Sequence, residues 1–281
     1  MPGAKAYIEE LEALKSTPLT DPHFVEAKYG PAELQLRTEG AYITRLLLTT
    51  SGGRPVDVLY AGPHTSVRKL DASHIMSPVG PSDGPGGQHG PARWLDYDAP
   101  PHLQTQTRNG FAGVQLQSKN PLVGPDAEVP FGKFFELGPH HLYTRTTVYN
   151  PTDELRTSIG EHFYFSLEDE FTDGLTVNGQ PLDNVLGDGA LERVMRGESQ
   201  FWEGYNGDAR IRFPAGHIVS LSTEVDDVAT TDTMGMLIWH REDTPSICFE
   251  PTIGFHPERG NEGIELADWS SATLGTRIEL L

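Results

Sequence analysis

The apolar residues of this chain follow two different periods, one near the N-terminus and another along the rest of the sequence. Near the N-terminus, apolar residues recur at three- and four-residue spacing, at Tyr7, Ile8, Leu11 and Leu14. This spacing is typical of one face of an amphipathic helix, and Pro18 marks where the helix ends. We therefore expect residues 1–17 to form a short helical extension added to one domain formed by residues 18–281.

After this segment the period changes to two or to short apolar runs, which is typical of β-strands. Turn-forming sequences such as TSGGRP, NPTDE and VNGQP separate the runs. The expected strands span residues 32–37, 43–49, 56–60, 111–117, 142–149, 158–167, 210–213, 218–223, 236–239, 247–250 and 276–280. The pattern predicts an all-β fold built from many short strands.

Length and composition agree with this interpretation. The chain has 281 residues, and its 30 glycines and 22 prolines are spread along the sequence, as turns between short strands require. A single β-sandwich or β-barrel domain runs to roughly 200–250 residues, so a second domain is not required.

The charge balance restricts the partners. A formal net charge of -19 produces a field that repels phosphate backbones and anionic lipid surfaces, so we expect neither nucleic-acid nor membrane partners. The same field opposes an anionic small substrate unless arginine or lysine side chains gather locally to offset it.

The single cysteine, Cys248, excludes an intrachain disulfide and a cysteine-rich zinc site. It suits a reducing compartment, and we expect a cytoplasmic protein. The first residues are charged throughout and lack the apolar core of a signal peptide, and no stretch reaches the ~18 apolar residues of a membrane span.

Glycine and proline concentrate in one long stretch without a period, residues 63–101. Such a stretch is either disordered or a functional loop. We favour the functional loop, because the stretch carries side chains in which a linker is poor, namely Arg68, Lys69, His74, His89, Arg93 and Trp94.

Three motifs can carry chemistry. The loop segment QHGPARW, residues 88–94, offers donors suited to sugar hydroxyls, although a histidine there can also be merely solvated. In GEHFYF, residues 160–165, strand alternation turns His162 and Tyr164 to one face, where the histidine is either functional or packed against aromatic rings. The apolar run ICFEP, residues 247–251, ends in Glu250, which is either a general base or part of a salt bridge.

In this order, the three motifs resemble those of the aldose 1-epimerases, and most closely the branch of the hexose-6-phosphate 1-epimerases. The family's Gln-His-Gly-Phe-Ala-Arg loop has Pro91 here in place of Phe, and its Gly-x-His-Pro-Tyr-Phe strand has Phe163 in place of Pro. Trp239 matches a tryptophan that precedes the Glu-Pro strand. Asp268 and Trp269 stand where the family has a Pro-Gly turn.

The resemblance implies a large antiparallel β-sandwich of the galactose mutarotase type, with a sugar cleft on one sheet. It implies interconversion of the α and β anomers of a hexose or hexose 6-phosphate without a metal or other cofactor, by a monomer or homodimer. Glu250 would be the general base and His162 the general acid, and His89 would steady charge near the ring oxygen. The expected substrate contacts are Arg93, Gln88, Asp183 and, as the nearest counterpart of a family arginine, Arg68.

Two other interpretations stay open from the residues. A carbohydrate-binding or regulatory module could keep the same pocket without performing chemistry, although both histidines and the glutamate are retained. A metal-dependent cupin is also an all-β enzyme, but cupins carry a His-x-His pair, and this sequence contains none.

Overall fold

The computed structural model describes residues 24–60, 73–77, 79, 89–90, 92–98, 104–108, 111–120, 129–150, 155–167, 174–226, 234–241, 244–258 and 263–281. The expected N-terminal helix, residues 1–17, lies outside this part of the chain. Within it, no helix is long and apolar enough to cross a membrane.

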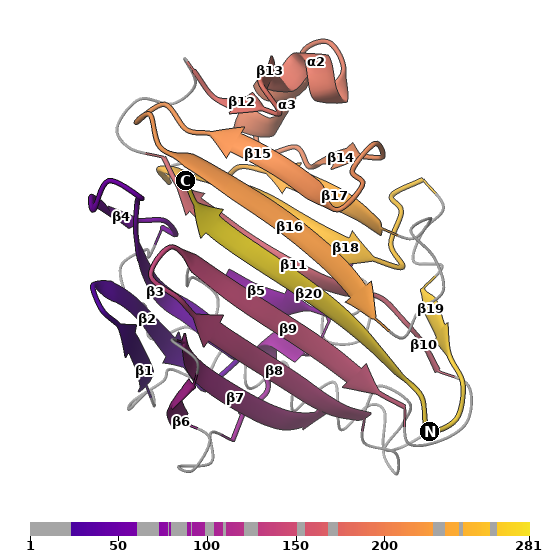
Figure 1. Ribbon diagram of the computed structural model, residues 1–281. Helices are drawn as coiled ribbons and strands as arrows, with labels where there is room; N and C mark the ends of the chain where they lie inside the picture. The colour runs from indigo at the N-terminus through magenta and orange to yellow at the C-terminus, as the bar shows by residue number, and fades with distance from the viewer. Residues whose placement is uncertain are drawn as a thin grey trace.

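The largest unit is a nine-stranded antiparallel sheet, seen face-on in Figure 1. Its strand order is β13-β12-β15-β16-β20-β9-β8-β7-β6. The strands are β6 (Gln104–Arg108), β7 (Phe111–Asn120), β8 (Val129–Leu137), β9 (His141–Tyr149), β12 (Thr176–Val177), β13 (Gln180–Pro181), β15 (Asp208–Arg212), β16 (Ile218–Asp226) and β20 (Ser271–Leu280).

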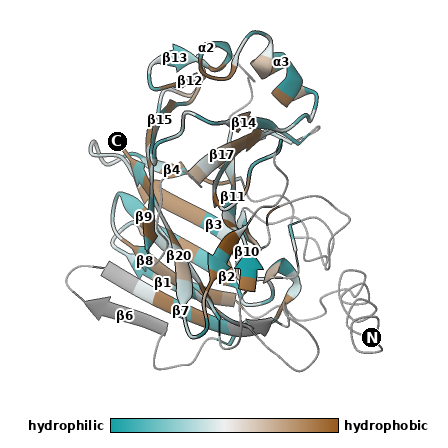
Figure 2. Cartoon of the chain, turned by 90° about the vertical axis from the view of Figure 1, so that its right-hand side faces the viewer, coloured by the Kyte–Doolittle hydropathy of each residue, from teal (hydrophilic) through white to brown (hydrophobic). Residues whose placement is uncertain are grey.

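Behind it in this view lies a five-stranded antiparallel sheet with the order β14-β17-β18-β11-β5. Its strands are β5 (Ser73–Met76), β11 (Ile159–Ser166), β14 (Gln200–Trp202), β17 (Met234–Trp239) and β18 (Ser246–Ile253). A four-stranded sheet, β1 (Phe24–Tyr29), β2 (Ala32–Arg37), β3 (Tyr42–Thr49) and β4 (Pro55–Asp57), continues this layer, and β10 (Leu155–Thr157) pairs with β19 (Ile264–Leu266). Figure 2 shows hydrophobic segments on strands of both layers.

The core lies between the layers because alternate residues of each strand point into it. On β11, Phe163 and Phe165 are fully buried in the core, and the Phe165 ring contacts Phe213 and Phe249 with centroids 5.8 and 5.9 Å away. Since neighbouring residues of a strand face opposite ways, His162 and Tyr164 lie on the outer face of the five-stranded sheet. The alternation predicted for residues 160–165 is thus confirmed.

A buried ion pair joins the layers behind that outer face. Glu161 of β11 accepts hydrogen bonds from Lys133 of β8 and Thr146 of β9, and Lys133 also donates to Thr146 at 2.9 Å. Both charged side chains are at most 2% exposed. An ion pair of this kind fixes β11 against the large sheet, since neither charge can remain buried without the other.

The antiparallel sheets confirm the all-β prediction, and several differences have local causes. Strand β5 and the 3-10 turn η1 (Ala92–Trp94) lie within the stretch expected to be one long loop, because four residues are too few to display a period. The run expected at 56–60 ends as a strand at Asp57, and Leu59 then bridges to Phe165 of β11. Two short helices, α2 (Leu182–Leu186) and α3 (Ala190–Met195), were not predicted.

Candidate active site

Strand pairing gathers the candidate residues on the outer face of the five-stranded sheet. Phe163 of β11 pairs with Phe249 of β18, so the residue before it, His162, stands beside Glu250. On its other side, His162 pairs directly with His74 of β5. Three chemically active side chains from distant parts of the sequence therefore form one row across three strands.

His162 and Glu250 are in direct contact. Nε2 of His162 lies 3.0 Å from Oε1 of Glu250, and both side chains are 3% exposed. Burial raises the pKa of Glu250 to about 8, against a smaller lowering by the positive charge of Arg93, and it lowers the pKa of His162 well below its usual value. Both directions favour an uncharged pair in the unliganded protein.

His89 approaches this row from the loop side. Its carbonyl oxygen accepts a hydrogen bond from the backbone N–H of Ser77 at 3.1 Å, which ties the residue to the end of β5. Its φ is 64°, a left-handed conformation that is uncommon for a histidine and is frequent at functional sites. Burial and the positive charge of Arg93 lower the pKa of His89 to about 3, so its ring is neutral.

Arg93 is positioned by the neighbouring four-stranded sheet. The hydroxyl of Tyr42 donates to the carbonyl oxygen of Arg93 at 3.0 Å, and the Arg93 guanidinium lies 4.8 Å from the centre of the Trp94 ring. Gly40 permits this approach, because a Cβ there would lie 2.5 Å from the same carbonyl oxygen. The guanidinium Nε is buried and has no hydrogen-bond partner among the described residues.

These side chains border a cavity of about 270 Å³. Tyr164 stacks on His162 with ring centroids 4.5 Å apart, and Trp239 is fixed by a hydrogen bond of 2.8 Å from its Nε1 to the carbonyl oxygen of Gly197. The described residues that line the cavity are His74, His89, Arg93, His162, Tyr164, Ser199, Leu237, Trp239, Arg241 and Glu250.

The structure therefore brings together four of the residues predicted from sequence: Glu250, His162, His89 and Arg93. It does not bring Asp183 to the cavity. Asp183 lies in α2, where its Oδ1 accepts a hydrogen bond from the backbone N–H of Leu191 at 2.7 Å and so supports the start of α3. Gln88 and Arg68 lie outside the described residues.

Among the cavity residues that were not predicted for the site, His74 and Arg241 have ionisable side chains. His74 lies in a strand of four residues without a visible period, and nothing local indicates that it pairs with His162. Arg241 comes two residues after Trp239, and this spacing is the signal that could have placed both on one face.

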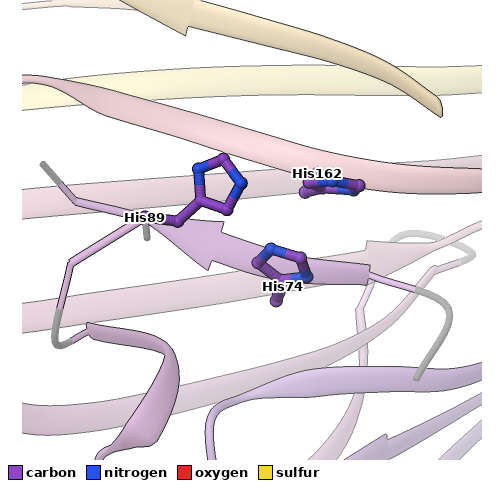
Figure 3. Close-up of side chains that lie close together, drawn as sticks. All are labelled: His74, His89 and His162. Atoms are coloured by element: carbon purple, nitrogen blue, oxygen red, sulfur yellow. The ribbon is translucent and has the colours of Figure 1, made fainter. Parts of the chain in front are cut away.

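Two groups of these side chains could hold a metal ion. One ring nitrogen from each of His74, His89 and His162 lies within 4.8 Å of the others, and the three rings face a common space in Figure 3. His162, Cys248 and Glu250 form the second group. Besides metal binding, the cavity can perform general acid and base chemistry on a hydroxylated ligand, since a carboxyl group, imidazoles and a guanidinium line it together.

Comparison with solved structures identifies the fold. A protein from Synechocystis sp. PCC 6803 is similar with a TM-score of 0.68 and 18% identity over 94% of this chain and 98% of its own. A galactose mutarotase-like protein from Lactobacillus casei ATCC 334 has a TM-score of 0.66 and 16% identity over 92% and 100%. A galactose 1-epimerase from Lactobacillus acidophilus NCFM has 0.62 and 13% over 93% and 98%.

No model of a known protein family matches the sequence, and the comparison with curated proteins found no match. Similarity to known proteins is therefore found only among the solved structures. They establish a galactose mutarotase-like antiparallel fold, as the sequence predicted, and at these identities they establish the fold alone.

Proposed function

We propose that this protein is an aldose 1-epimerase that interconverts the α and β anomers of a hexose. The observation that carries the proposal is the buried contact between His162 and Glu250 at 3.0 Å, on the floor of a cavity that also holds Arg93 and His89. A base and an acid side by side are what opening a sugar ring requires. The match to a galactose 1-epimerase structure supports the same activity.

In the proposed reaction, Glu250 takes the proton of the anomeric hydroxyl while His162 gives a proton to the ring oxygen. The bond between C1 and the ring oxygen breaks, and an open-chain aldehyde forms. After rotation about the C1–C2 bond, the two transfers run in reverse and close the ring on the other face of C1. Each transfer by a positioned group contributes typically ~10²–10⁴-fold to the rate.

The contact of 3.0 Å between the two side chains can support this exchange. Moving one proton along it converts a carboxylic acid and an imidazole into a carboxylate and an imidazolium, with no proton taken from solvent. Burial favours the uncharged pair, and the positive charge of Arg93 favours the carboxylate that the first transfer needs. In the proposed reaction His89 hydrogen-bonds the ring oxygen, and its neutral ring and its buried Nδ1 without a partner among the described residues support this role.

The cavity also bears on the substrate class. At about 270 Å³ it is at the small end of ligand pockets, which favours a monosaccharide over a longer sugar. Arg93 and Arg241 both line it, and two guanidinium groups offset locally the overall net charge of -19. We therefore favour a 6-phosphorylated hexose as the substrate, acted on in the cytoplasm.

Anomer exchange measured by saturation-transfer NMR tests the proposal. We expect the wild type to accelerate exchange of at least one sugar among glucose, galactose and their 6-phosphates, and Glu250→Gln to bind that sugar while exchange falls by ~10²-fold or more. A carbohydrate-binding module of the same fold would bind sugar and leave exchange at the solvent rate even in the wild type. That result would overturn the proposal.

A further inference from the structure

Three histidines meet in the cavity, and acid and base catalysis uses only part of what they offer. His74 and His162 stack with ring centroids 4.3 Å apart, and the His89 ring lies 5.6 Å from each of them. They come from β5, from the turn before η1, and from β11, so the fold itself assembles the cluster (Figure 3).

Four of the six ring nitrogens of this cluster lack partners among the described residues. All three histidines are buried. Both ring nitrogens of His74, and Nδ1 of His89 and of His162, are buried without a hydrogen-bond partner among the described residues. Buried polar atoms are seldom left unpaired, so a group of them facing one space indicates a ligand that the described part of the chain does not supply.

The second ring nitrogen of His162 is already engaged in the way that metal sites require. Its Nε2 contacts Glu250 at 3.0 Å. When Glu250 is ionised, Nε2–H donates to the carboxylate, and the lone pair of Nδ1 is then free to bind a metal. Histidine ligands of metals almost always donate their other ring N–H to a carboxylate or carbonyl oxygen, which fixes the tautomer and the ring orientation.

The donor set also selects the class of ion. Three imidazole nitrogens suit zinc and other late first-row metals, whereas magnesium and calcium require oxygen ligands. The positive charge of Arg93 on the same cavity opposes weakly held cations, and the carboxyl group of Glu250 can compensate for it when ionised. Zn–N distances of about 2.0–2.1 Å need ligand atoms closer together than the present limit of 4.8 Å. To close the site, the stacked rings of His74 and His162 would have to turn so that both point at the ion.

We propose that His74, His89 and His162 bind one divalent transition-metal ion such as Zn²⁺, with Glu250 holding His162 in place behind them. If the proposed function is right, the ion occupies two of the side chains that the sugar needs. Metal and sugar then exclude each other, and Zn²⁺ inhibits an enzyme whose chemistry does not require it.

The test begins with full-length protein treated with chelator and dialysed. Titration with Co²⁺ is followed by its visible absorption, and titration with Zn²⁺ by calorimetry. We expect one ion per chain. His74→Phe should weaken binding by at least ~10-fold, and Glu250→Gln should weaken it by ~10-fold, as the loss of outer-shell partners of metal sites does. His74→Gln, which keeps a polar side chain, serves as a second variant in case the first does not fold.

His217→Asn is the matched control, because this buried histidine lies in the turn between β15 and β16 and does not line the cavity. It should bind Co²⁺ like the wild type. Absence of binding at tenfold excess of metal would overturn the proposal, and so would an equal loss of affinity in the His74 and His217 variants.

Anomer exchange with and without Zn²⁺ separates this proposal from the proposed function. Inhibition by Zn²⁺ in the wild type, relieved in His74→Phe relative to the exchange of that variant without metal, supports both. Co²⁺ binding at these histidines in a protein without any exchange would keep the metal site and reject the epimerase. Exchange that disappears with chelator and returns with Zn²⁺ would keep the site and reject the metal-free reaction.

Discussion

Nε2 of His162 and Oε1 of Glu250 lie 3.0 Å apart on adjacent antiparallel strands, enclosed so that each side chain is 3% exposed. Neither strand by itself specifies this contact. In the proposed function the two residues act as one proton-exchanging unit, and the first prediction follows from this.

The variants Glu250→Gln and His162→Asn should each lower anomer exchange by ~10²-fold or more, and the double variant should be scarcely slower than the slower single one. The reason is that both groups act in one exchange of protons, so removing either disables both. Saturation-transfer NMR gives the rates, and calorimetry verifies that sugar still binds. Losses that multiply in the double variant would mean that the two groups act independently.

Arg241→Ala should raise the KM for a hexose 6-phosphate by more than tenfold and change the KM for the free hexose much less. A guanidinium on the cavity wall contributes charge-assisted hydrogen bonds that only a phosphate fully uses. Arg196→Ala, which removes a mostly exposed arginine of a surface salt bridge, is the control and should change neither value. Equal turnover of glucose and glucose 6-phosphate, unaffected by loss of Arg93 or Arg241, would contradict a phosphorylated substrate.

Lys133→Met should lower the free energy of unfolding by about 3–5 kcal/mol, because it leaves Glu161 buried without its cation. The double variant Lys133→Met/Glu161→Gln should be more stable than Lys133→Met, since no uncompensated charge remains. Urea unfolding curves measure both effects. If Lys133→Met lowers the free energy of unfolding less than the double variant does, the pair does not behave as a buried ion pair.

Trp269→Gly should raise the free energy of unfolding by about 0.5 kcal/mol. Trp269 has a φ of 58° and is 80% exposed, so the left-handed backbone is strained while the side chain gains little from packing. Trp269→Ala is the matched control: it removes the same ring but keeps a Cβ, and should bring no gain. Thermal unfolding of the wild type and the two variants measures the change in stability. An equal gain in both variants would mean that loss of the ring, and not relief of backbone strain, causes it.

Much of the fold and part of the cavity lining could be predicted from local sequence. A period of two determines which side chains of a strand share a face. In residues 160–165 it separated His162 from Phe163 correctly, and the apolar run before Glu250 placed that carboxyl group in a buried strand. The short helices α2 and α3 carry no amphipathic repeat, so the sequence does not predict them. The stretch around β5 is predicted as a loop because a strand of four residues is too short to display a period.

The sequence by itself determined the class of fold and which face of each strand is polar. Only the tertiary structure decided which strands are neighbours, because hydrogen bonding between strands depends on contacts far apart in the chain that no local period encodes. For this reason Asp183 lies at the start of a helix and not at the cavity, whereas Arg241 lines the cavity although the sequence did not predict it there. His74 belongs to the site only because β5 pairs with β11, which stacks its ring on that of His162.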